Sequence, residues 1–289
     1  NTYMNFPISI AAYSFYGLQS SGRLDTFGYL DLLKFRYYVD NADIYNLYFP
    51  TLEEDYLKKV RASLDERNLS VANLCVDGPH VWMDDPEERE AHKKQVFEYI
   101  RAAEIIGAKT IRVDFGGKDG HTMPEDAFEY IVGNYKEYAA RCNELGIKIG
   151  PENHWGWDRV PEYLKKVYDA VDSPAYGHLF HLGNFYDQPD EGTEWCINHA
   201  MHCHIHAGSV PYAKDIIRRM AASGYQGCYS IEHHTLEHEM QRVEWQLGAV
   251  RSMIEELKTE GIDHPATPDY ISTVYYEEQG LLGPATPIY

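Results

Sequence analysis

The chain has 289 residues, of which 44% are hydrophobic, which is enough to bury the core of one large domain. Its formal net charge of −19 is spread over many short acidic patches, which argues against nucleic acid as a partner. No apolar run approaches the ~20 residues that cross a bilayer, and residues 1–7 lack the pattern of a signal peptide, so we expect no membrane partner and a cytoplasmic protein, with a removed export signal as the alternative.

Along the chain, a unit recurs in which an amphipathic helical stretch leads through Gly or Asn into a short apolar strand. It can be followed eight times, with strands expected at residues 8–15, 41–47, 69–76, 109–115, 147–152, 177–182, 201–206 and 227–233. Helices are expected between them, among others at residues 51–67, 86–106, 124–145, 160–170, 213–223 and 235–257. The second and sixth units are the weakest, and the helix expected around residues 194–200 is short.

Strict alternation of strands and helices implies parallel strands with helical crossovers. Eight such units predict a closed (β/α)₈ TIM barrel, an α/β fold, as a single domain over residues 1–261. From residue 262 the pattern stops, and a stretch rich in proline and tyrosine predicts an extended arm over residues 262–289. A disordered tail is the alternative, but the tyrosines favour an arm packed on the barrel or on a second subunit, so we expect a homo-oligomer.

Polar residues that end apolar strands are candidates for chemistry, because barrel enzymes carry their active sites where strands run into the following loops. Four consecutive strands end in this way, at Glu152, His181, His204 and Glu232. Each of these residues alone has an ordinary structural explanation, as a salt-bridge partner or a hydrogen-bonded core histidine. Together, two carboxylates and two imidazoles in a small volume would repel or have to bind protons, and a divalent cation removes that conflict.

We therefore expect one divalent metal ion held by Glu152, His181, His204 and Glu232. Mixed Glu and His ligation suits Mn²⁺, which we favour, and also Co²⁺, Fe²⁺ or Zn²⁺, with Mg²⁺ less favoured. The five cysteines are widely spaced and lack a CxxC pair, so a structural zinc site is not expected.

Six segments carry a resemblance to a known family: AAYSFYGL, GAKTIRVDFGG, GIKIGPENHWG, HLFHLGNF, HCHIH and GCYSIEHH. In this order and spacing, over roughly residues 7–257, the chain resembles the xylose isomerase-like TIM barrel superfamily of sugar phosphate isomerases and epimerases. Its tagatose and psicose 3-epimerase branch holds one metal with a Glu, an Asp, a His and a Glu after or on strands five to eight. The resemblance thus implies Glu152, His204 and Glu232 as ligands, whereas His181 stands where that branch has Asp.

A second departure follows the seventh strand, where no Arg or Lys appears before Lys214. Phosphate sites in barrels need cationic or Gly-rich contacts there, so we expect a neutral carbohydrate as the small-molecule substrate. Candidate substrate-binding residues are Trp155, Trp157, His80, Asn184 and His206, with the tryptophans placed to stack on a sugar ring opposite Trp82 and His80. A loop packed by its own aromatic side chains is the alternative.

The leading hypothesis is a metal-dependent isomerase or epimerase that moves a proton through an enediolate, with Glu152 and Glu232 as catalytic residues. A lyase, hydratase or deglycosidase acting on a 3-keto sugar or glycoside is the alternative, with His154, two residues from Glu152, as acid and base. Less favoured are an endonuclease IV-like DNA repair hydrolase, because strand two ends without His, and a non-catalytic sugar-binding subunit of a heteromeric enzyme.

Overall fold

A computed structural model of the protein describes residues 6–265. The arm predicted over residues 262–289 therefore lies almost wholly outside the described residues. None of the described helices is both long and apolar enough to cross a membrane.

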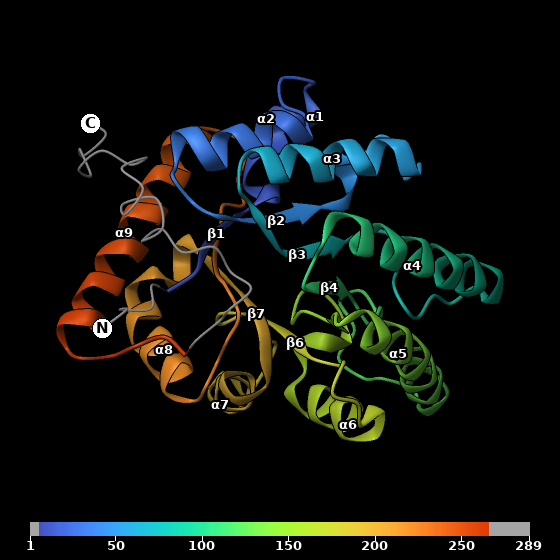
Figure 1. Cartoon of the computed structure of the whole chain (residues 1–289). Helices are drawn as coiled ribbons and strands as arrows, with labels where there is room; N and C mark the ends of the chain where they lie inside the picture. The colour runs from blue at the N-terminus through green and yellow to red at the C-terminus, as the bar shows by residue number, and fades with distance from the viewer. Residues whose placement is uncertain (1–5, 266–289) are drawn as a thin grey trace.

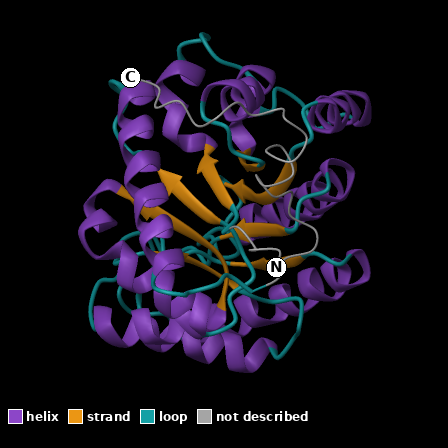
Figure 2. Cartoon of the chain, turned by 60° about the vertical axis from the view of Figure 1, so that its left-hand side comes forward, coloured by secondary structure: helices purple, strands orange, loops and turns teal. Residues whose placement is uncertain are grey.

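Eight parallel strands form a nearly closed barrel with helices between them, as the alternating pattern predicts (Figures 1 and 2). Their order in the sheet is β5-β4-β3-β2-β1-β8-β7-β6. The strands are β1 (Ile8–Ala11), β2 (Asn41–Tyr45), β3 (Ser70–Val76), β4 (Thr110–Val113), β5 (Lys148–Gly150), β6 (His178–His181), β7 (Ala200–His206) and β8 (Tyr229–Glu232).

The helices cover the outside of the barrel (Figure 2). They are α1 (Tyr16–Ser20), α2 (Thr26–Asp31), α3 (Glu54–Glu66), α4 (Pro86–Ile106), α5 (Glu125–Leu145), α6 (Pro161–Val171), α7 (Pro189–His199), α8 (Val210–Ala222) and α9 (Glu239–Thr259). Shorter turns are η1 (Ala12–Phe15), η2 (Leu32–Arg36), η3 (Asn46–Tyr48), η4 (Trp157–Arg159) and η5 (Ala207–Ser209).

Local sequence signals set the two ends of α4. Asp85 precedes it, and its side chain accepts a hydrogen bond from the Glu87 N–H, while Pro86 takes the first position, where no N–H is needed. At the other end Gly107 adopts a left-handed conformation with φ of 77°, which ends the helix and turns the chain toward β4.

The interior of the barrel is unusually polar. Buried polar side chains line it from several strands, among them Ser9, Asn41, Asp43, Asn73, Thr110, Arg112, His202, His204 and Ser230. Asp43 on β2 contacts His202 and His204 on β7, which is not a neighbouring strand, so these contacts run across the barrel. Buried polar groups need partners, so the interior is organised by hydrogen bonds rather than by apolar packing alone.

The barrel closes between β5 and β6, the two ends of the sheet order. Three backbone hydrogen bonds join the chain there: Ile149 N to Ala175 O at 2.9 Å, Gly177 N to Ile149 O at 3.1 Å, and Leu179 N to Pro151 O at 2.8 Å. We call these three contacts the β5–β6 seam. It brings Glu152 beside β6, where it bridges to Leu179.

The structure differs from the sequence-based expectation in three places. The first strand ends at Ala11 instead of residue 15, because the chain turns into η1 and places Tyr13 in the barrel mouth. Residues 16–36, where the sequence pattern predicts no helix, contain α1, α2 and η2. The short helix expected around residues 194–200 begins earlier, at Pro189, and spans eleven residues.

Candidate metal and active site

Four side chains from consecutive strands meet at the carboxyl end of the barrel. Glu152 lies two residues after the end of β5, His181 and Glu232 are the last residues of β6 and β8, and His204 lies within β7. All four are buried, and each offers one ligand atom such that these atoms lie within 4.8 Å of one another. The structure therefore brings together the residues that the sequence nominates as metal ligands.

Both imidazoles present Nδ1 to both carboxylates. Glu152 Oε2 lies 2.9 Å from His181 Nδ1 and 3.4 Å from His204 Nδ1. Glu232 Oε2 lies 3.4 Å from His204 Nδ1, and its Oε1 lies 3.9 Å from His181 Nδ1. This is a compact set of two nitrogen and two oxygen donors, which fits a divalent transition metal.

Two other groups of side chains could also supply three ligand atoms: Asp43 with His202 and His204, and Asp77 with Asp114 and His154. In the second group the guanidinium of Arg112 already lies 2.5 Å from Asp77 and 3.0 Å from Asp114. In the first group Asp43 brings the only carboxylate and already accepts hydrogen bonds. The group around Glu152 and Glu232 is thus the best fit for a cation.

The electrostatics of the four-residue group agree with a need for positive charge. Burial raises the pKa of both glutamates, but the charges of His154 and His204 hold the pKa of Glu152 well below its ordinary value. For Glu232, His204 and His234 outweigh burial and lower the pKa to about 2. Burial lowers the pKa of His204, but the surrounding carboxylates, Glu232 first, raise it well above its ordinary value.

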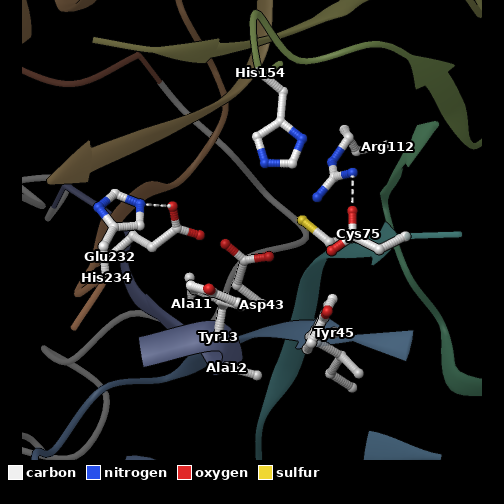
Figure 3. Close-up of a pocket in the computed structure, with 12 residues that line it drawn as sticks. Ala11, Ala12, Tyr13, Asp43, Tyr45, Cys75, Arg112, His154, Glu232 and His234 are labelled. Carbon is white, nitrogen blue, oxygen red and sulfur yellow. Dashed lines mark hydrogen bonds and ion pairs between the residues drawn. The ribbon is translucent and has the colours of Figure 1, made fainter. Parts of the chain in front are cut away.

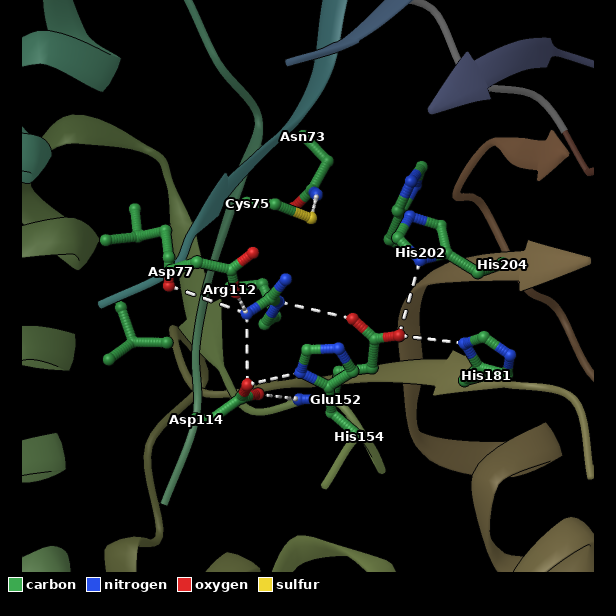
Figure 4. Close-up of polar contacts among 12 residues, drawn as sticks. Asn73, Cys75, Asp77, Arg112, Asp114, Glu152, His154, His181, His202 and His204 are labelled. Atoms are coloured by element: carbon green, nitrogen blue, oxygen red, sulfur yellow. Dashed lines mark hydrogen bonds and ion pairs between the residues drawn. The ribbon is translucent and has the colours of Figure 1, made fainter. Parts of the chain in front are cut away.

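Arg112 on β4 links this group to the opposite wall of the barrel. Its buried guanidinium pairs with Asp77 and Asp114, and its Nε lies 3.2 Å from Glu152 Oε1 (Figure 4). Burial lowers the pKa of Arg112, but Asp114 and Asp77 raise it well above its ordinary value. Arg112 therefore stays charged and engages one oxygen of Glu152, which leaves the other oxygen facing the imidazoles.

A cavity of about 310 Å³ opens beside the group. Figure 3 shows Glu232 and His234 on one side of it and Arg112 on the other. Its lining comprises Ala11, Ala12, Tyr13, Asp43, Ile44, Tyr45, Cys75, Asp77, Arg112, His154, Glu232 and His234. Glu232 is thus both a candidate ligand and a wall of the cavity, and its Oε1 lies 2.6 Å from His234 Nε2.

His154 forms a second carboxylate–imidazole pair at the cavity. Its Nδ1 lies 2.7 Å from Asp114 Oδ2, which leaves Nε2 for other partners. Burial lowers the pKa of His154, but Asp114 and Glu152 outweigh it and raise the pKa to about 10. The cavity is therefore lined by two histidines, each held by a carboxylate.

The predicted substrate-binding residues lie around the site but outside the lining of the described cavity. Trp155 donates from Nε1 to Asp114 Oδ2 at 3.1 Å, and the ring of His80 packs edge-on against it at 4.3 Å. Trp157 is buried with 6% of its surface exposed, and its ring centroid lies 6.5 Å from that of Trp82.

Asn184 and His206 also contact residues of the site. Asn184 donates from Nδ2 to the carbonyl oxygens of Asn153 and His154, which fixes the loop after β5. His206 Nδ1 lies 3.1 Å from His181 Nε2. Direct contact of these five residues with substrate stays a prediction.

Sequence reasoning did not single out four residues of this site: Asp43, Arg112, Asp114 and His234. Asp114 ends the apolar run of the fourth strand in the same way that Glu152 ends the fifth, so the same criterion would have found it. Asp43 and Arg112 lie inside strands, where a polar residue in an apolar run is equally typical of a core hydrogen bond. Only the register across the barrel reveals their contacts.

Three comparisons with known proteins bear on the fold. Residues 35–253 match the model of the family described as xylose isomerase-like TIM barrel. Among curated proteins, none matches the sequence.

Several solved structures share the architecture. A xylose isomerase-like TIM barrel protein from Mycobacterium smegmatis, in complex with magnesium, is 16% identical with a TM-score of 0.67, covering 86% of this chain and 98% of its own. The 3-keto-D-glucoside 4-epimerase of E. coli is 14% identical with a TM-score of 0.69, covering 86% and 99%. A D-psicose 3-epimerase is 12% identical with a TM-score of 0.65, covering 88% and 98%. Identities this low show a shared fold.

Proposed function

Because the chain belongs to the xylose isomerase-like TIM barrel family, we propose that it is a metal-dependent sugar isomerase or epimerase acting on a non-phosphorylated sugar or keto-sugar. The observation that carries this proposal is the group formed by Glu152, His181, His204 and Glu232, which lies beside a cavity that Glu232 lines. The same family fold occurs in a 3-keto-D-glucoside 4-epimerase and a D-psicose 3-epimerase, which supports a carbohydrate substrate.

In this proposal the four side chains hold one divalent cation, with Mn²⁺ favoured by the mixed donor set. When bound, such an ion stabilises the negative charge that develops on substrate oxygens as a neighbouring C–H loses its proton. Glu152, engaged by Arg112 and by both imidazoles, serves as a ligand.

Glu232 is the better base of the two glutamates, because it lines the cavity whereas Glu152 is outside the described lining. His154, held by Asp114 at Nδ1, can give a proton from Nε2 to a substrate oxygen. The two groups reach the cavity from β8 and from the loop after β5, so together they can remove a proton from one atom and supply one to another.

The charge of the cavity supports a neutral substrate. Arg112 is the only Lys or Arg in the described lining, and it is already surrounded by Asp77, Asp114 and Glu152. A phosphate would find no unpaired cation there and would face carboxylates instead.

The test is to incubate metal-loaded protein in D₂O with free sugars, 3-keto sugars and glycosides, and to follow them by NMR. We expect deuterium at the carbon next to the carbonyl. Glu232→Gln should lose at least 100-fold in turnover, since a positioned base contributes about 10²–10⁴-fold. Glu237→Gln, in the exposed part of the same loop, is the matched control and should keep full activity.

His154→Ala separates the two reaction classes. If the product is an unsaturated or cleaved sugar, the protein is a lyase, and this variant should impair elimination more than hydrogen exchange. Turnover without carbon-bound deuterium in product or recovered substrate would contradict the proton-transfer proposal, as would full activity in Glu232→Gln.

A further inference from the structure

Asp43 is a fully buried carboxylate on β2 at which hydrogen bonds from four side chains converge, three of them at Oδ2. Its Oδ2 lies 2.8 Å from His202 Nε2 and 2.8 Å from His204 Nε2, and it accepts a hydrogen bond from Ser230 Oγ, also at 2.8 Å. Figure 3 shows this carboxylate at the cavity, near Glu232. The proposed reaction gives Asp43 no direct part, so its contacts call for another explanation.

The contact with His204 decides which ring nitrogen is available to a cation. An ionised carboxylate only accepts hydrogen bonds, and a neutral imidazole carries one N–H. Because Asp43 faces Nε2, a His204 ring that gives up one proton to bind a cation keeps its N–H on Nε2 and offers the lone pair of Nδ1. Nδ1 is the atom that lies 3.4 Å from both Glu152 Oε2 and Glu232 Oε2.

Contacts with residues of β3 and α2 hold Asp43 in position. Asn73 on β3 donates from Nδ2 to Asp43 Oδ1 at 2.9 Å, so both carboxylate oxygens are engaged. The strand pairing shifts register between Ala42 and Asp43, which places Asn73 directly opposite Asp43. The hydroxyl of Tyr29 also accepts a hydrogen bond from the Asp43 N–H at 2.9 Å.

We infer that Asp43 is a positioning residue that fixes the His204 tautomer, so that Nδ1 is the atom that ligates the metal of the proposed function. Carboxylates that orient ligating histidines raise metal affinity in other proteins by about 10–100-fold. Asp43 performs this role across the barrel, from the opposite strand, and does not itself join the ligand set.

Asp43→Asn tests the role with little change in shape. The amide replaces one oxygen by a donor. If the new NH₂ group takes the place of Oδ2, it faces the N–H of His204 Nε2. If it takes the place of Oδ1, it faces the NH₂ group of Asn73. In either orientation two hydrogen-bond donors face each other. With the full chain, we expect calorimetry to show that Co²⁺ binds about 10–100-fold more weakly, because a ligating histidine loses the carboxylate that orients it. Circular dichroism should show an unchanged fold.

Ser230→Ala is the matched control, since it removes a hydrogen bond to the same oxygen without touching a candidate ligand. Its Co²⁺ affinity should stay within about threefold of the wild type, because Asp43 keeps its contacts with His204 and Asn73 and so still orients the His204 ring. An equal loss in both variants would indicate general loosening of the barrel and overturn the inference.

A second measurement needs no variant. In the Zn²⁺-loaded wild type with ¹⁵N-labelled histidine, NMR should show a protonated Nε2 and a metal-bound Nδ1 for His204. Metal on Nε2, or unchanged Co²⁺ affinity in Asp43→Asn, would overturn the inference about Asp43 alone. A wild-type chain that binds no divalent metal would overturn the proposed function as well.

Discussion

Asp40, just before β2, is a carboxylate that is costly for the fold to bury. It is 5% exposed, and burial raises its pKa from 3.8 to about 7, although Lys34 and Arg251 partly oppose the shift. The folded chain therefore holds the proton more tightly than the unfolded chain. Below pH 4 both states are protonated. As pH rises from about 4 to 7, the unfolded state ionises first, and the folded state loses stability.

Asp40→Asn should remove this loss. Relative to the wild type, the variant should gain up to about 4 kcal/mol in free energy of unfolding by pH 8, since the pKa rises from 3.8 to about 7 and one unit corresponds to about 1.36 kcal/mol. Urea unfolding at several pH values measures it. Asp55→Asn, on the exposed surface of α3, removes a carboxylate without changing a buried side chain and is the matched control. A parallel pH profile for wild type and Asp40→Asn would rule out Asp40 as the source.

At the same scale, the sequence could nominate Glu152, His181, His204 and Glu232 because each ends or lies within an apolar strand of a recognisable unit. The structure brings these four residues together. It could not nominate Asp43, since the role of Asp43 depends on contact between β2 and β7, which are separated by more than 150 residues. The spacing of residues along β2 does not indicate which residues of β7 they contact.

Among the elements, the approach of β5 to β6 depends on the lack of a side chain at Gly150. A Cβ built there would lie 1.6 Å from the carbonyl oxygen of Gly177, which is backbone and cannot move aside. Gly150→Ala should therefore force the strands apart and lower the free energy of unfolding by about 1–3 kcal/mol or more.

Gly177→Ala is the informative comparison for Gly150→Ala. Its Cβ would lie 2.9 Å from Met201 Cβ, a much milder overlap than the 1.6 Å approach to the Gly177 carbonyl oxygen at Gly150. Chemical denaturation should show a clearly smaller loss for Gly177→Ala. Equal stability of Gly150→Ala and the wild type would show that the β5–β6 seam tolerates separation.

The long helices could be located from the sequence, and the short ones could not. α4 and α5 each span 21 residues and end at a left-handed glycine, so both periodicity and end signals were present. α1 and α2 have five and six residues, which is too short for a helical period to emerge. The extension of α7 to Pro189 was signalled only by that proline, which is common at the first helical position.

For the whole molecule, a bound metal should act as a global stabiliser, because its proposed ligands come from β5 to β8. Binding to the folded state alone adds about 2.7 kcal/mol when the free metal is 100-fold above its Kd. For a domain of this size, that corresponds to a rise in Tm of about 5–10 °C. Differential scanning calorimetry of metal-free protein with and without Mn²⁺ measures it.

The Glu152→Gln, Glu232→Gln double variant provides the control. It should show no Mn²⁺-dependent change in Tm, and elemental analysis should find about one metal per wild-type chain and none in the variant. Metal retained by the double variant, or three zinc ions per wild-type chain, would refute the single site.

The β5–β6 seam also has a kinetic consequence. Among the described residues, three backbone hydrogen bonds and the two bonds between the Asn153 side chain and the His181 backbone close the barrel there, so we expect local opening to begin at this joint. Glu152 and His181 lie on opposite sides of it, and any such opening pulls two proposed ligands apart. The residence time of a bound cation would then depend on the frequency of local opening between β5 and β6, rather than on the strength of the individual metal–ligand bonds.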